Sequence, residues 1–245
     1  DDYDHFHHIE GEFSQELKVY SGMLKALDRS VGRILDTLEK NNLTDNTLIV
    51  LTSDNGGANY IHLSDINKPY RGWKLTHFEG GLHVPFMAKW PNKIKPGIEF
   101  NAPIHANDIL PTFAAAAGAE LPDDRIIDGV NLLPFLQNHN SEMPHETLYW
   151  LQGRLQTVLH ENWKLITDHR TGKDWLFNVE SDPYERINLA SEMTLKVEEL
   201  KRLLNDHKKV QPPPLYDNTM SVPILIDKHN GYTFQDGDEF TYWDN

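Results

Sequence analysis

Asp54 and Asn55 are the first residues in the sequence that could carry chemistry, because they follow an apolar stretch and precede Gly56-Gly57. An α/β fold usually places its ligand site where a strand of a parallel sheet ends. A carboxylate beside an amide oxygen favours Ca²⁺ or Mg²⁺ over Zn²⁺, because hard cations take oxygen ligands. The same residue types also build tight turns. These four residues therefore fit a metal site and a plain turn equally well.

The segment from Lys68 to Lys95 is cationic, although the whole chain has a net charge of -14. Glu79 is its one acid, against the basic side chains Lys68, Arg71, Lys74, Lys89, Lys93 and Lys95. This pattern indicates a local anion site rather than a surface for polyanions. The ammonium group of Lys74, in a glycine-rich stretch, could hold a sulfate or phosphate oxygen as a compact point charge. Its alternative is a solvated surface lysine.

A second glycine pair, Gly80-Gly81, lies between Glu79 and the apolar Val84-Pro85-Phe86. Glycine permits close approaches of the backbone that other residues resist. We therefore predict a tightly packed loop here, in which Glu79 holds the loop in place rather than performing acid–base work.

Composition excludes several classes of protein. The 245 residues contain no Cys, which removes thiolate metal sites and thiol nucleophiles. The negative charge argues against nucleic acid as a partner, and no apolar run approaches the roughly 20 residues of a membrane span. The first residues lack the features of a signal peptide and an initiating Met. We expect a chain processed or shortened at its amino end.

Apolar periodicity predicts a helix over residues 14–40 and a strand over 47–52 that is buried on both faces. Residues 84–90 form a second predicted strand. Asn107-Asp108 could cap a helix that stops at Gly118, and residues 131–138 form another short helix. Residues 1–141 are therefore predicted to be part of an α/β domain with a parallel-rich sheet flanked by helices.

The pattern changes near Glu142, where short aromatic and β-branched runs alternate with turns. They predict an antiparallel sheet of strands 147–151, 155–160, 163–167 and 175–179. A helix over 191–208, with Leu195, Leu200, Leu203 and Leu204 on one side, would cover it. Residues 142–210 would thus form a small α+β domain. Residues 211–245 form an acidic extension that is too aromatic for an ordinary disordered tail.

Several motifs in this order resemble the sulfatase family of the alkaline phosphatase superfamily, of the arylsulfatase type. The resemblance covers roughly residues 3–204. The motifs are Asp54-Asn55-Gly56, Arg71-Gly72-Trp73-Lys74, Glu79-Gly80-Gly81, Val84-Pro85, His105 to Thr112, Asp128 to Pro134, Leu176-Phe177-Asn178, Asp182 to Glu185 and Asn188-Leu189-Ala190. His83 departs from the Arg that the family usually has before Val-Pro, which leaves the local charge of the pocket open.

The resemblance implies that Asp54 and Asn55 supply two ligands of a single Ca²⁺ and that Lys74 binds the sulfate group. It also implies a formylglycine nucleophile, made from a Cys or Ser in a Cys/Ser-x-Pro/Ala-x-Arg motif, and a His that protonates the leaving alcohol. It places such proteins in the periplasm, outside the cell or in a lysosome-like compartment. Sulfated small molecules or sulfated carbohydrates are the implied substrates.

The nucleophile motif is absent from this sequence. Ser181-Asp182-Pro183-Tyr184-Glu185-Arg186 has its Arg one place too far along. We therefore expect a carboxy-terminal part of a sulfatase, inactive as it stands, with half of its calcium ligands and weak Ca²⁺ affinity. His5, His7 and His8 fit the entry to a helix better than the role of the acid. His62, Arg71, His77 and His83 fit contact with substrate or packing of the loop.

Two other functions remain open. A phosphoesterase or phosphate mutase of the same superfamily would bind two metals and carry Asp-His where this chain has Asp54-Asn55. A non-catalytic relative would bind a ligand or merely fold. The sequence does not identify the substrate or the oligomeric state.

Overall fold

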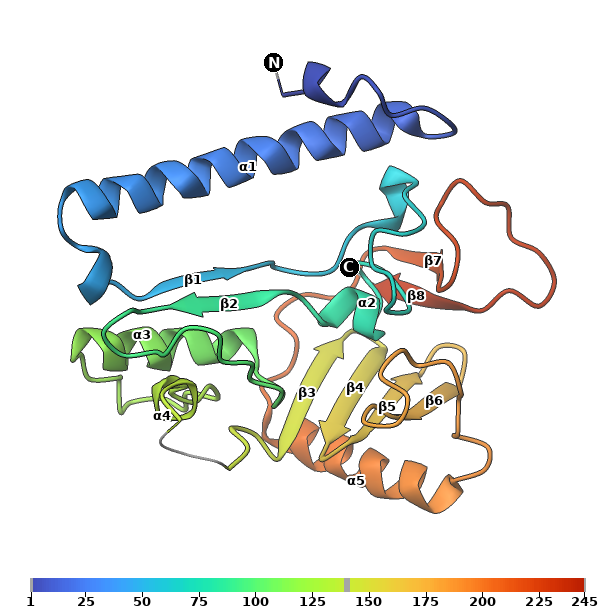
Figure 1. Ribbon diagram of the computed structural model, residues 1–245. Helices are drawn as coiled ribbons and strands as arrows, with labels where there is room; N and C mark the ends of the chain where they lie inside the picture. Colours follow the sequence, from blue (N-terminus) through green and yellow to red (C-terminus); the bar gives the residue numbers. More distant parts are fainter. Residues whose placement is uncertain (1, 139–141, 245) are drawn as a thin grey trace. The chain divides into compact units, whose positions relative to one another are not determined.

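The computed structural model describes residues 2–138 and 142–244, and the predicted boundary after residue 141 lies outside them. The chain divides into two compact units. The first comprises residues 1–6, 21–52 and 85–146. The second comprises residues 7–20, 53–84 and 147–245 (Figure 1). The second unit therefore includes the 53–84 segment with the candidate site, which the sequence had placed with the larger domain.

Helix α1 (Ser14–Lys40) has the predicted bounds, but the described residues cover its apolar stripe only in part. Met23, Leu24, Leu27 and Ile34 are exposed, and Gly22 is its one buried residue in the described chain. A Cβ at Gly22 would lie 3.3 Å from the backbone nitrogen of Tyr3, so this turn packs against the amino-terminal residues. The periodicity thus predicted the helix correctly without showing what covers it.

Strand β1 (Ile49–Thr52) differs from its prediction in both pairing and burial. In the described residues its partner is β2 (Phe86–Lys89), and the pair is antiparallel, with Ile49 opposite Lys89. No β1 residue is fully buried, and Leu51 and Met87 are exposed. A continuous apolar run is typical of a strand covered on both faces, but the run does not itself supply the elements that cover it. The predicted parallel neighbours are not among the described strands.

The first unit is closed by α3 (Ile109–Ala117) and α4 (Leu133–Leu136), whose side chains pack with Trp90 and Ile94. Gly118 ends α3 in the left-handed conformation, as predicted. The buried carboxylate of Asp108 does not cap α3. Its oxygens accept hydrogen bonds from the backbone nitrogens of His105 (2.7 Å) and Val130 (2.8 Å) and contact His145 Nε2 at 2.8 Å. Asp108 therefore fastens three segments of the unit.

The second unit contains the predicted antiparallel sheet. Its strands are β3 (Thr147–Gln152), β4 (Leu155–His160), β5 (Trp163–Asp168) and β6 (Lys173–Asn178), in that order. Helix α5 (Thr194–Val210) covers one face, and its Leu200 and Leu204 pack on Leu165 and Leu176 (Figure 1). Leu195 does not join this face, because it is exposed.

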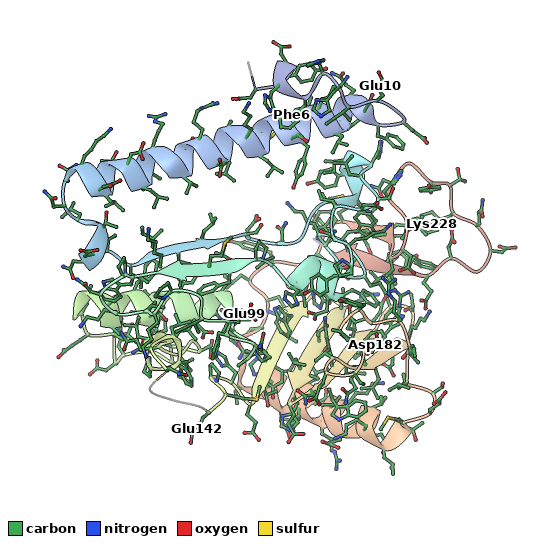
Figure 2. The ribbon with its side chains drawn as sticks, viewed as in Figure 1. Phe6, Glu10, Glu99, Glu142, Asp182 and Lys228 are labelled. Carbon is green, nitrogen blue, oxygen red and sulfur yellow. The ribbon has the colours of Figure 1, made fainter. Side chains whose placement is uncertain are left out.

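The opposite face of this sheet positions the candidate site. Trp175 and Phe177 pack there with Phe78, from the 53–84 loop, and with Ile226, from the carboxy-terminal extension. That extension forms a hairpin of β7 (Ser221–Leu225) and β8 (Phe240–Asp244). Lys228, labelled in Figure 2, contacts Asp238 at 2.7 Å within the hairpin's connecting loop.

Across the described ranges, no helix is long and apolar enough to cross a membrane.

Candidate functional site

The 53–84 loop is wound so closely that two of its turns touch through their backbones. A Cβ on Gly56 would lie 1.7 Å from the carbonyl oxygen of Gly80, and a Cβ on Gly80 would lie 2.3 Å from that of Gly72. The Gly56 nitrogen donates to the Gly81 carbonyl at 3.0 Å. Gly72 adopts a positive φ of 86°. The predicted close backbone approach at Gly80 is confirmed, and it draws three sequence motifs together.

Asp54 and Asn55 lie on the first of these turns. Asp54 is exposed and Asn55 is half-buried. The Ser53 hydroxyl donates to the Asn55 carbonyl at 2.9 Å, and the Asn55 amide nitrogen donates to the Gly56 carbonyl at 2.9 Å. These bonds fix the turn and leave the Asn55 amide oxygen and the Asp54 carboxylate, which accepts a long bond from the Ser53 hydroxyl at 3.5 Å, as possible metal ligands. This set fits part of a hard-cation site. Within residues 2–138 and 142–244, no three His, Asp or Glu side chains converge as a metal site.

Lys74 is held beside this turn by its own backbone, because its nitrogen donates to the Gly57 carbonyl at 3.0 Å. Its side chain is half-buried and lines a cavity of ≈ 370 Å³. In the part of the chain that the structure describes, no carboxylate pairs with its ammonium group. The structure thus brings the three predicted site residues into one loop and leaves the Lys74 cation available to an external anion.

Glu79 secures the loop to the sheet, as predicted. Its Oε1 lies 2.6 Å from Lys164 Nζ on β5, and its Oε2 lies 2.8 Å from Nδ1 of His83. Lys164 also contacts Glu185 Oε1 at 2.8 Å. The other Glu185 oxygen accepts a hydrogen bond from the Glu79 nitrogen at 2.6 Å, at the start of helix α2 (Glu79–Leu82). One buried lysine therefore bridges two carboxylates, and one of those carboxylates caps the loop's short helix.

Burial alone would raise the pKa of Glu79, but the Lys164 charge and the hydrogen bonds from His83 and Lys164 lower it to about 2. Burial raises the pKa of Glu185, and the Lys164 charge does not fully offset this. Burial opposes the charge of Lys164, yet the two carboxylates raise its pKa. Lys164 and Glu79 thus form the charged pair of this triad.

The motif that contains Asp182 delivers Glu185 to the triad. The two Asp182 oxygens accept hydrogen bonds from the backbone nitrogens of Arg186 (3.0 Å) and Ile187 (2.9 Å), and Asp182 is labelled in Figure 2. Glu185 has a positive φ of 56°, which a residue other than glycine seldom adopts. This turn therefore directs the Glu185 carboxylate toward Lys164 and the 53–84 loop, which we call the site loop.

Arg71 joins the loop to the carboxy-terminal hairpin. Its Nε and Nη2 donate to the two carboxylate oxygens of Asp227 at 2.8 and 2.7 Å, and Nη2 also bonds Glu239. Its guanidinium lies over the Phe78 ring. Burial opposes its charge, but the two acids raise the pKa of Arg71 above its usual value. Of its two predicted roles, Arg71 takes loop packing rather than contact with substrate.

The histidines divide between packing and exposed positions. His77 is buried, with Nδ1 2.9 Å from the Thr157 hydroxyl, and His62 packs against Phe13 and His229. His83 stacks on Tyr70 while it contacts Glu79. His7 and His8 are exposed near the start of α1. His62 and His77 thus follow the packing alternative.

His77 should make stability depend on pH. Burial, assisted by the Lys164 charge and opposed by a hydrogen bond with Gln152, lowers its pKa to about 3. Between about pH 6.5 and 3 the unfolded chain binds a proton here that the folded chain does not. Stability is therefore complete above about pH 6.5 and falls as pH drops, by up to about 1.4 kcal/mol per pH unit.

Urea unfolding at about pH 7.5, 6 and 5 measures this dependence. His77→Gln, whose amide can still bond the Thr157 hydroxyl, should flatten it across the same interval. An equally steep loss in the variant would show that another group titrates.

Two family models match the chain. The model described as Sulfatase matches residues 1–119, and the one described as N-sulphoglucosamine sulphohydrolase, C-terminal, matches residues 72–210. Steryl-sulfatase of Rattus norvegicus is 38% identical over 171 residues, which cover 67% of this chain and 29% of the relative.

Solved structures show the same relationship. Ps i-CgsB in complex with k-i-k-neocarrahexaose matches with a TM-score of 0.72 and 32% identity, over 84% of this chain and 45% of that one. BT4656 in complex with its substrate D-glucosamine-2-N,6-O-disulfate matches with a TM-score of 0.58 and 26% identity, over 82% and 43%. A phosphonate monoester hydrolase from Silicibacter pomeroyi, at 20% identity, a TM-score of 0.62 and coverage of 80% and 41%, shares the fold. The chain spans less than half the length of each protein.

Proposed function

The chain belongs to the sulfatase family of the alkaline phosphatase superfamily, and we propose that it supplies the sulfate-holding part of a site that hydrolyses sulfate esters. The observation that carries the proposal is Lys74, a half-buried residue whose ammonium group has no carboxylate partner among the described residues and whose backbone is bonded beside the Asp54-Asn55 turn. Lys74 would bind a sulfate oxygen and stabilise the charge that develops on it.

We further propose that Asp54 and Asn55 are two of the ligands of one Ca²⁺. Their carboxylate and amide oxygens are the ligands that calcium prefers, and the turn that carries them is fixed by internal hydrogen bonds. Bound there, Ca²⁺ would neutralise sulfate charge and orient the ester. A formylglycine would supply the nucleophile in the family's reaction, and this sequence contains no residue that can be assigned to it.

We propose a sulfated carbohydrate as the substrate class. BT4656, with the same fold and 26% identity, has a disulfated glucosamine as its substrate. A phosphate ester is the competing substrate, since it offers similar oxygens. Two zinc or manganese ions per chain in a metal analysis would favour phosphoryl transfer, whereas one calcium agrees with sulfate hydrolysis.

Lys74→Ala should weaken the binding of inorganic sulfate about 10- to 100-fold, because a hydrogen bond to a charged group contributes about 1.5–3 kcal/mol. Lys68→Ala is the matched control, since Lys68 lies in the same loop but is exposed and pairs with Asp65 at 2.6 Å. It should change the affinity less than about 2-fold. Titration calorimetry compares the two variants, and equal effects would contradict the role of Lys74.

Asp54→Ala should abolish the weak binding of Ca²⁺ that two ligands can supply, which we expect at Kd values of about 10⁻⁴–10⁻³ M or weaker. A submicromolar dissociation constant for the unaltered chain would contradict a partial ligand set.

A further inference from the structure

The ≈ 370 Å³ cavity beside Lys74 is also lined by residues that have no part in the proposed binding of sulfate. Its polar lining comes from Lys74, Asn59 and Asn230. The remaining lining is apolar or aromatic and includes Tyr60, Val222 and Trp243. A cavity with a few polar groups on a mainly apolar lining is typical of a site for an organic ligand.

The apolar wall is built by the carboxy-terminal hairpin. Val222 on β7 and Trp243 on β8 are directly opposed in the ladder, so their side chains share one face. Trp243 is half-buried and Val222 is 39% exposed. Tyr60, which also lines the cavity, is 52% exposed. These side chains therefore present apolar surface that the described residues do not cover.

This wall is fixed relative to Lys74. Arg71, three residues before Lys74, is bonded to Asp227 and Glu239, which flank the two hairpin strands. At the other side of the cavity, the Asn59 amide nitrogen donates to the Asn230 amide oxygen at 2.9 Å. The cation and the aromatic wall thus belong to one unit and are held by the same contacts.

The charges favour a ligand with an anionic end. Several other lysines of this unit have carboxylate partners at short range, namely Lys164, Lys173, Lys201 and Lys228. Lys74 has none among the described residues, and it lines a cavity that is otherwise mainly apolar. A ligand that joins an anion to a ring with an apolar face would satisfy both parts.

We propose that Trp243, with Val222 and Tyr60, receives the ring of the alcohol that carries the sulfate, and so determines which esters are bound. The ligand class is the sulfate ester of a cyclic alcohol, either a sugar or an aryl compound. The exposed Asn230 amide would bond a ring hydroxyl where one is present. This inference rests on the proposed function, because it places the sulfate group on Lys74.

Ligand-observed NMR titrations of the whole chain test it with three probes: inorganic sulfate, glucose 6-sulfate and 4-nitrophenyl sulfate. We expect the two ring esters to bind more tightly than inorganic sulfate. Trp243→Ala should lower the affinity for both esters about 10-fold and change the affinity for inorganic sulfate less than about 2-fold. Trp243→Phe, which keeps a ring in the half-buried position, should retain most of the affinity. Tyr216→Ala is the control, since Tyr216 is an exposed aromatic residue of the same extension outside the cavity.

Two results would overturn the proposal. One is equal affinity of the unaltered chain for the ring esters and for inorganic sulfate. The other is a Trp243→Ala variant with an unchanged thermal midpoint whose affinity for inorganic sulfate falls as much as its affinity for the ring esters. Failure of the sulfate role is distinguishable, since Lys74→Ala would then leave inorganic sulfate binding unchanged while Trp243→Ala still weakened the ring esters.

Discussion

Lys164→Met is expected to lower the free energy of unfolding by about 3–5 kcal/mol, because it leaves two carboxylates without their buried cation. The Lys164 side chain is 1% exposed and that of Glu185 is fully buried. Methionine fills a similar volume, so the loss would come from charge rather than from a cavity. Urea unfolding followed by tryptophan fluorescence measures it.

Lys201→Met is the control for this experiment. Lys201 also pairs with a carboxylate, Asp174 at 2.6 Å, but its side chain is 40% exposed. Exposed pairs contribute about 0–1 kcal/mol. Adding Glu79→Gln to Lys164→Met should recover part of the stability, since Glu79 is the ionised partner of Lys164 and its replacement removes the uncompensated charge. A Lys164→Met loss no larger than that of Lys201→Met would contradict a buried charge triad.

Gly56→Ala is expected to disrupt the site loop more severely than any surface change. The added methyl would lie 1.7 Å from the Gly80 carbonyl oxygen, which is backbone and cannot rotate away. We expect a loss of about 4 kcal/mol or more, together with loss of sulfate binding.

Gly32→Ala is the matched substitution, because nothing lies within 4 Å of a Cβ at that position of α1. Alanine in a helix should stabilise the chain by about 1 kcal/mol. Denaturant midpoints and sulfate titrations compare the two variants. Full sulfate affinity in Gly56→Ala would show that the turn and the Lys74 segment do not depend on their close packing.

Local elements of this fold were predictable because local patterns determine them. The helix over residues 14–40 and the short aromatic and β-branched strands of the small sheet appear at nearly the predicted bounds. The pairing of β1 was not predictable, because a four-residue apolar run carries no information about the direction of its neighbour.

The partners of Glu79 were also not predictable, because the sequence does not show which distant residues come into contact. Glu79 was predicted to hold the loop, but its partners Lys164 and Glu185 were missed, since they lie 85 and 106 residues further along the chain. One signal was available for Lys164. Lys164 lies two residues before Ile166 on β5, and residues two apart in a strand point to the same face. The strand pattern therefore places this lysine on the same inward face as Ile166. A buried lysine requires an acidic partner, although the sequence does not say which one.

The bonds from Arg71 to Asp227 and Glu239 form late in the synthesis of the loop and hairpin, because the partners are far apart in the sequence. Arg71 and Asp227 are separated by 156 residues. At about 5–20 residues per second, the ribosome needs roughly 10–30 s to produce the second partner after the first. The loop that carries Asp54, Asn55 and Lys74 therefore lacks Asp227 and Glu239, the two acids that bond Arg71, until the hairpin has been made. The site is thus completed after the small sheet, and a chain that stops before Asp227 would keep the sheet but not a finished pocket.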